Sequence, residues 1–310
     1  MLTLGLTTYR PETIPLAEDL MATADSVWLE EPQTPGLAEM LAGELDIDTY
    51  LQLTDYGFAR YAQDQCRLLR RLAAKGIAIR QVDPFMDELV RIHEFFAAGG
   101  APEQIQEATT RAVYEAEREW TRPLLAFYRA SAEAGFDRIV ATVQAFARAD
   151  AARGRLRDSM RATVLCEHVD SGQAVYVEAG YIHFSLVHEL LRRGVRPRIR
   201  FVLEPIYRRL CGRRQAVAPG DILTWWYFFH PRATGRRLDR LAAQALVYNK
   251  IVAKEELPTE QGQYPHAADE VRAIGLVHGL EYDACREVFQ QIRALPTDTA
   301  RQYLETQGTG

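Results

Sequence analysis

The sequence predicts an α/β protein with a mainly parallel sheet, a helical insertion and a helical carboxyl-terminal region. Short apolar runs alternate with amphipathic helical segments over residues 1–84. The alternation returns at residues 174–203, after a long segment of purely helical character. The apolar runs are continuous, which is typical of parallel strands that are covered on both faces.

Three strands are expected in the first part of the chain. The apolar runs at 2–6 and 27–29 flank a helix that Pro11 can open at its first turn. A second amphipathic helix at about 60–75 leads to a third strand at 77–82. Strand, helix and strand therefore repeat in the order that builds a parallel sheet.

Long helical segments rich in Ala, Glu, Arg and Gln are predicted at about 85–160. They either pack as a helical layer or cover a cleft as a lid. A fourth strand at 174–177 precedes a helix that begins near residue 183. A fifth strand follows at 195–203, and Pro197 places it at a sheet edge.

We expect residues 1–205 to form one α/β domain that carries the insertion, with residues 206–310 packed on it as a helical region. The expected carboxyl-terminal helices lie at about 219–229, 233–255 and 266–292. Five consecutive aromatic residues at 225–229 would encircle a helix. They are therefore either buried in the core or part of an interface in a homo-oligomer, such as a homodimer.

The composition indicates an ordinary globular protein, with 47% hydrophobic and 25% charged residues in a chain of 310. The net charge of -5 argues against a nucleic-acid partner. Arg196, Arg198 and Arg200 would share one face of a strand, and acidic side chains of the same chain are their expected partners. A phosphate, a nucleic acid or a partner protein is the alternative.

The chain is expected to be cytoplasmic, without a membrane partner. Its first residues lack the features of a secretory signal, and no apolar run approaches the roughly 20 residues needed to span a bilayer. Its four cysteines are widely separated and lack a CxxC pair, which favours reduced thiols. They are Cys66, Cys166, Cys211 and Cys285.

Acidic residues follow three of the predicted strands. Glu30 and Glu31 leave the second strand, Asp83 follows the third, and Glu178 ends the fourth. Carboxyl ends of parallel strands meet at one rim of a sheet, so these carboxylates are expected to converge in one concave pocket. Because side chains alternate, only one of the two consecutive glutamates is expected to face that pocket. A solvated acidic loop is the alternative.

His183 follows the glycine turn after the fourth strand and opens a helix. The positive end of the helix dipole favours a neutral imidazole, and therefore a base or a metal ligand. A capping or packing histidine is the alternative. In a cleft, His183 would contribute less to stability than a core residue.

Four segments resemble the superfamily of erythromycin esterase-like, ChaN-like and TraB/TIKI-like proteins. They are Gly-Leu-Thr-Thr at 5–8, Val-Trp-Leu-Glu-Glu-Pro at 27–32, Ile-Arg-Gln-Val-Asp-Pro at 79–84 and Val-Tyr-Val-Glu-Ala-Gly-Tyr-Ile-His at 175–183. The resemblance implies an α/β fold. It also implies one of three activities: ester hydrolysis, metal-dependent peptide cleavage or haem binding.

The resemblance places the family's late glycine-x-x-histidine at residues 180–183 and its acid at Glu30 or Glu31. Thr8 stands where the family carries an early histidine, which puts hydrolysis in doubt. Tyr9 and Arg10 follow in the same loop and would either bind an anionic ligand or form a surface turn.

The resemblance implies a cleft-based hydrolase or related enzyme that acts on a small molecule or peptide. His183 would be a base or metal ligand, and Glu30 or Glu31 would orient a water or a metal. Glu178 and Asp83 would support them through hydrogen bonds. The alternative is a catalytically reduced ligand-binding or regulatory protein, and the cofactor, a divalent metal or haem among the options, stays open.

Overall fold

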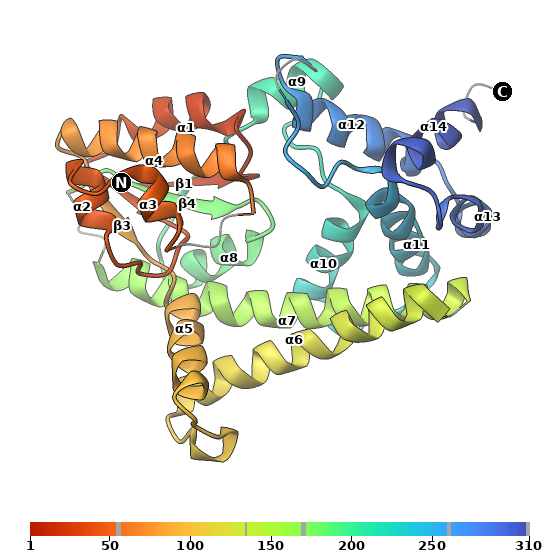
Figure 1. Ribbon diagram of the computed structural model, residues 1–310, viewed down its shortest axis with the longest axis horizontal. Helices are drawn as coiled ribbons and strands as arrows, with labels where there is room; N and C mark the ends of the chain where they lie inside the picture. Colours follow the sequence, from red (N-terminus) through yellow and green to blue (C-terminus); the bar gives the residue numbers. More distant parts are fainter. Residues whose placement is uncertain (54–56, 134, 169–171, 259–261, 308–310) are drawn as a thin grey trace. The chain divides into compact units, whose positions relative to one another are not determined.

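The computed structural model describes residues 1–53, 57–133, 135–168, 172–258 and 262–307 (Figure 1). The chain divides into two compact units. Unit 1 comprises residues 1–114 and 156–205, and unit 2 comprises residues 115–155 and 206–310.

The described part of unit 1 contains a five-stranded parallel sheet in the order β3-β2-β4-β1-β5. This confirms the predicted α/β class and places the predicted strands in one sheet. The fifth strand lies at an edge, as Pro197 indicated. The strands are β1 (Leu2–Thr7), β2 (Ser26–Leu29), β3 (Ala78–Gln81), β4 (Val175–Gly180) and β5 (Arg198–Phe201).

Helices cover both faces of this sheet (Figure 1). One face packs Val27, Leu29 and Tyr176 against α1 and α4. The other packs Leu4 and Val177 against the last turns of α7 and against α8. The helices with residues in unit 1 are α1 (Thr13–Met21), α2 (Leu37–Ala42), α3 (Ile47–Leu51), α4 (Ala59–Ala74), α5 (Pro84–Ala97), the short 3-10 helix η1 (Pro102–Gln104), α6 (Ala108–Glu133), α7 (Phe136–His168) and α8 (Phe184–Arg192).

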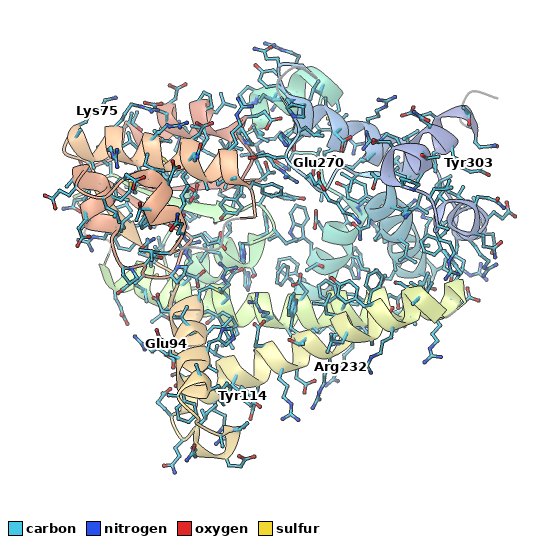
Figure 2. The ribbon with its side chains drawn as sticks, viewed as in Figure 1. Lys75, Glu94, Tyr114, Arg232, Glu270 and Tyr303 are labelled. Atoms are coloured by element: carbon cyan, nitrogen blue, oxygen red, sulfur yellow. The ribbon has the colours of Figure 1, made fainter. Side chains whose placement is uncertain are left out.

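The residues at the end of α4 turn the chain into the next strand, β3. Lys75 is the carboxyl-terminal cap of α4 (Figure 2). Gly76 follows with φ 86°, in the left-handed region that favours glycine. The chain therefore turns sharply after the helix and enters β3.

The helical segment expected at about 85–160 is divided between the two units. Residues 115–155 group with residues 206–310 because apolar side chains such as Phe136 and Ile139 share a core with Leu223 of α10. The helices of unit 2, besides its parts of α6 and α7, are α9 (Glu204–Cys211, which begins in unit 1), α10 (Pro219–Phe229), α11 (Arg236–Ile251), α12 (Pro265–His278), α13 (Tyr282–Ile292) and α14 (Thr297–Gln307).

The aromatic segment at 225–229 enters the core of unit 2. Tyr227 and Phe228 are buried, whereas Phe229 is 50% exposed. The helix expected at 266–292 is two helices, α12 and α13, separated after Gly279. Across the described ranges, no helix has a stretch long and apolar enough to cross a membrane.

In the described part of the chain, the three arginines at 196, 198 and 200 lack the acidic partners that the sequence predicts for them. Within the described residues, Arg196, Arg198 and Arg200 form no ion pair, although acids of the same chain were expected to face them. The reason is that Arg196 and Arg198 are exposed to water rather than covered by another element. Hydration reduces the repulsion between these charges without a protein partner.

Candidate functional site

The strand order creates a topological switch point between β1 and β4. The chain leaves β1 toward β2 on one side of the sheet and leaves β4 toward β5 on the other. In open α/β sheets, ligands bind in the crevice at the carboxyl ends of such strands. The loop that follows β1, residues 8–12, and the loop that follows β4, residues 181–183, lie at the carboxyl ends of these two strands.

Glu30 is the carboxylate at the centre of this rim. Its Oε2 accepts hydrogen bonds from the Tyr9 hydroxyl at 2.7 Å and from the Gly180 backbone N–H at 2.6 Å. Its Oε1 lies 2.9 Å from His183 Nε2 and 2.9 Å from Arg157 Nη2. The side chain is only 3% exposed, so four neighbours from different loops and helices hold it in place.

His183 joins Glu30 to a second carboxylate. Its Nδ1 lies 2.7 Å from Asp158 Oδ1, and the Ser185 hydroxyl donates to the other oxygen of Asp158. Both ring nitrogens therefore face carboxylates. We refer to Asp158, His183 and Glu30 as the charge chain.

The charge chain favours a protonated imidazole. Burial lowers the pKa of His183, but the negative charges of Glu30 and Asp158 outweigh burial and raise it to about 10. The neutral imidazole expected from the helix dipole is therefore wrong, because two adjacent carboxylates act more strongly on the ring than the helix terminus does. A protonated ring donates one hydrogen bond to each carboxylate, from Nδ1 to Asp158 and from Nε2 to Glu30.

Glu30 is correspondingly ionised. Burial alone would raise its pKa, but His183, Arg157 and Arg161 hold it well below the usual value. Of the members of the charge chain, His183 has the most exposed side chain, at 11%, against 3% for Glu30 and 1% for Asp158. His183 is therefore the member of the charge chain that lies nearest to solvent.

Two arginines from α7 connect the rim to the sheet. Arg157 binds Asp83 through Nε at 2.8 Å and also through Nη2. Asp83 is fully buried and caps α5 by accepting the Met86 N–H at 3.1 Å. Arg161, 1% exposed, donates to the carbonyls of Val82 at 2.9 Å and Glu178 at 2.6 Å.

Glu31 and Glu178 lie away from His183. Glu31 accepts from the Gln81 side chain at 2.9 Å, and Glu178 faces Gln65 of α4 at 3.4 Å. Consecutive side chains at the end of β2 alternate, so Glu30 turns toward α7 while Glu31 turns the other way. The structure thus brings Glu30 to His183, links Asp83 through Arg157, and places the carboxyls of Glu31 and Glu178 elsewhere.

The environment of Glu178 predicts a pH effect on stability. Burial, followed by the charges of Glu31 and Glu30, raises its pKa from the ordinary value of 4.5 to about 8. Between these values the folded protein retains a proton that the unfolded chain releases, so stability falls as pH rises through this window. We expect Glu178→Gln to flatten that fall relative to the wild type, measured by urea unfolding from pH 4.5 to 8. Parallel stability curves for the two proteins would contradict it.

The loop after β1 carries an unusual backbone. Tyr9 has φ 50°, in the left-handed region that residues other than glycine rarely adopt. Its ring lies edge-on to Tyr61, with centroids 5.9 Å apart. On either side of it, Thr8 Oγ1 and Arg10 Nη1 are buried and find no hydrogen-bond partner among the described residues.

Sequence reasoning missed Arg157, Asp158, Arg161 and Ser185. One signal was present, because Asp158 and Arg161 precede the buried Ala162 and Leu165 at helical spacing. Charged residues on an apolar helix face need buried partners. The sequence could have revealed this mismatch, although it could not identify the partners.

The site does not fit a divalent cation. Among the described residues, no group of three or more His, Cys, Asp and Glu side chains is arranged to hold a metal ion. Guanidinium groups already neutralise Glu30 and Asp83, and both nitrogens of His183 face carboxylates. A cation would have to displace Arg157 and would meet the positive charge of the imidazolium.

A pocket of about 680 Å³ lies near β2 and β3. Its lining includes Asp83, Trp28 and Arg80. Glu30, Glu178 and His183 do not line it, so this pocket is not the single cavity expected to hold all the acids. Glu30 and His183 instead belong to a buried polar network beside the β1 and β4 loops, and Glu178 faces α4.

The chain is similar to an uncharacterized protein from Archaeoglobus fulgidus, with 29% identity over 284 residues. The alignment covers 91% of this chain and 96% of that protein, so the similarity extends over both units. No family model and no solved structure matches the chain.

Proposed function

We propose that unit 1 is a hydrolase or a related small-molecule enzyme of the erythromycin esterase/ChaN-like kind. The observation that supports it is the buried charge chain at the switch point of a parallel sheet. The substrate would be a small molecule or peptide that enters beside His183 and Arg157, whose side chains are 11% and 16% exposed.

The geometry supports a specific division of roles. Ionised Glu30 orients a water and accepts its proton as the water attacks a carbonyl carbon. This requires the substrate to displace Arg157 or His183 from Glu30 Oε1, because both oxygens are otherwise occupied. Arg157 stabilises the negative charge that develops on the carbonyl oxygen. His183, held as the imidazolium by Asp158, donates its Nε2 proton to the leaving oxygen or nitrogen when the bond to the acyl carbon breaks. This reverses the base role that the resemblance implies for His183.

The second candidate is a ligand-binding or regulatory protein without turnover. Thr8 favours it, because it replaces the early histidine of the resembled family. Haem or metal binding through His183 would require the imidazolium to lose a proton and one of its carboxylate partners. The charge chain therefore favours an organic ligand over either group.

The free thiols favour a reducing compartment for this activity. All four cysteines are unpaired in the structure, and reduced cysteines are typical of cytoplasmic proteins. We therefore propose a cytoplasmic protein. A homo-oligomer contact that includes the half-exposed Phe229 of unit 2 is a further proposal.

Two consecutive glutamates provide a matched test of the site. We expect Glu30→Gln to lower kcat/KM by about 10²-fold or more on any ester or peptide that the wild type hydrolyses, because the amide cannot accept the water's proton. Glu31→Gln has the same change of charge and shape on the other side of β2, and we expect it to stay within a few-fold of the wild type.

The same variants separate the two candidates. The binding protein would be favoured if the wild type turns over none of the ester and peptide substrates and Glu30→Gln loses ligand binding. Wild-type turnover by a folded Glu30→Gln would contradict both roles for this residue. Far-ultraviolet circular dichroism of each variant verifies that the fold is intact.

A further inference from the structure

The buried network around the charge chain is electrically balanced within itself. The imidazolium and two guanidiniums contribute three positive charges, and three carboxylates contribute three negative ones. The six groups are His183, Arg157, Arg161, Glu30, Asp83 and Asp158. The network therefore carries no net charge before a ligand binds, and a permanent charge on a ligand needs a partner outside it.

Arg10 lies outside this balance. Within the described residues, no carboxylate forms an ion pair with its guanidinium, and its buried Nη1 has no hydrogen-bond partner. The guanidinium carbon lies 4.0 Å from the centre of the Phe58 ring. Stacking on an aromatic face holds the guanidinium plane, and a planar or tetrahedral anion that enters beside the buried Nη1 would give this donor a partner.

Thr8 adds a second unsatisfied group to the same loop. Its hydroxyl is buried and has no partner among the described residues. Burying a donor without an acceptor costs stability, and natural sites keep such groups when a ligand satisfies them. Both residues follow β1 at the switch point.

Tyr9 ties this loop to the charge chain. Its hydroxyl donates to Glu30 at 2.7 Å, and its left-handed backbone separates Thr8 from Arg10. The unsatisfied groups are therefore neighbours in sequence of a residue that touches the central carboxylate. Arg10 is therefore the next residue along the loop from one that contacts Glu30.

We infer that Thr8 and Arg10 form an anion subsite, and that the ligand is a small organic anion bearing a carboxylate or a phosphate. This inference rests on the proposed function for the position of the reacting group. The anion anchors at the β1 loop, and the remainder of the ligand extends toward Glu30 and His183. Neutral esters lack the anchoring group and bind weakly.

Binding of inorganic phosphate and of succinate to the full chain tests the subsite without any need for turnover. At constant ionic strength we expect either anion to raise the melting temperature of the wild type. Arg10→Met preserves an apolar contact with Phe58 but removes the charge. We expect it to weaken binding, measured by calorimetry, by about tenfold or more, because a charge-assisted hydrogen bond is lost.

Arg80→Met is the matched control. The Arg80 guanidinium also lies over an aromatic ring, 5.5 Å from that of Trp28, but on β3. We expect this variant to bind as the wild type does. Thr8→Val should weaken binding to a smaller extent, and it provides a second variant if Arg10→Met does not fold.

Each outcome of these binding experiments supports or overturns the subsite. Binding of phosphate alone or of succinate alone identifies the anion class and supports the subsite. Failure of the wild type to bind either anion, or wild-type affinity in both Arg10→Met and Thr8→Val, would overturn it. Anion binding through Arg10 in a protein without turnover would refute the hydrolase and retain the subsite, so the two proposals fail separately.

Discussion

Replacing His183 with alanine is expected to lower the free energy of unfolding by about 3–5 kcal/mol. The imidazolium lies between two carboxylates that are 3% and 1% exposed, those of Glu30 and Asp158. Its removal leaves Asp158 without its cationic partner in a buried position. This loss is larger than expected for a histidine on a cleft wall, because His183 is part of a buried ion network.

The exposed His188 lies on the same helix and is the control for this change. His188→Ala should change the free energy of unfolding by no more than about 0.5 kcal/mol, as is usual for a surface position. Urea unfolding at pH 7, followed by circular dichroism, measures both variants. Equal losses in the two variants would show that the ion network contributes nothing specific.

Arg161→Met is expected to have an effect of similar size, about 3–5 kcal/mol. The guanidinium binds the carbonyls of Val82 and Glu178, and its Nη1 lies 3.6 Å from Glu30 Oε2. Methionine fills part of the volume, but it removes one donor from each of two buried carbonyls and a cation beside Glu30.

An exposed arginine provides the comparison. Arg71 pairs with Glu18 at 2.7 Å, and half of its side chain is exposed to water. Arg71→Met should therefore cost no more than about 1 kcal/mol. The same urea series compares the two arginines. A loss below about 1 kcal/mol for Arg161→Met would mean that its contacts to the strand ends are not needed to hold the rim together.

The sheet was predictable because its strands carry local signals. Continuous apolar runs and their Pro and Gly boundaries placed all the strands, and Pro197 placed β5 at the edge. The strand order was not predictable in the same way. The insertion of β4 between β1 and β2 depends on pairing between residues more than 140 positions apart, such as Val27 and Tyr176.

The site was predictable only in part. The position after a strand indicated Glu30, and the glycine turn indicated His183. The charge state of His183 depends on Asp158, a residue of α7 that only the fold brings to the ring. The roles of Arg157 and Arg161 were hidden for the same reason, because charged residues in a long helix ordinarily face water.

The most direct measurement is the nitrogen-15 imidazole spectrum of His183, recorded with and without bound phosphate. The structure predicts that both ring nitrogens are protonated at pH 7, that the ring titrates near a pKa of about 10, and that bound phosphate shifts its resonances. A neutral ring that titrates near 6.5 and is unaffected by phosphate would contradict both the charge chain and its position in the ligand site.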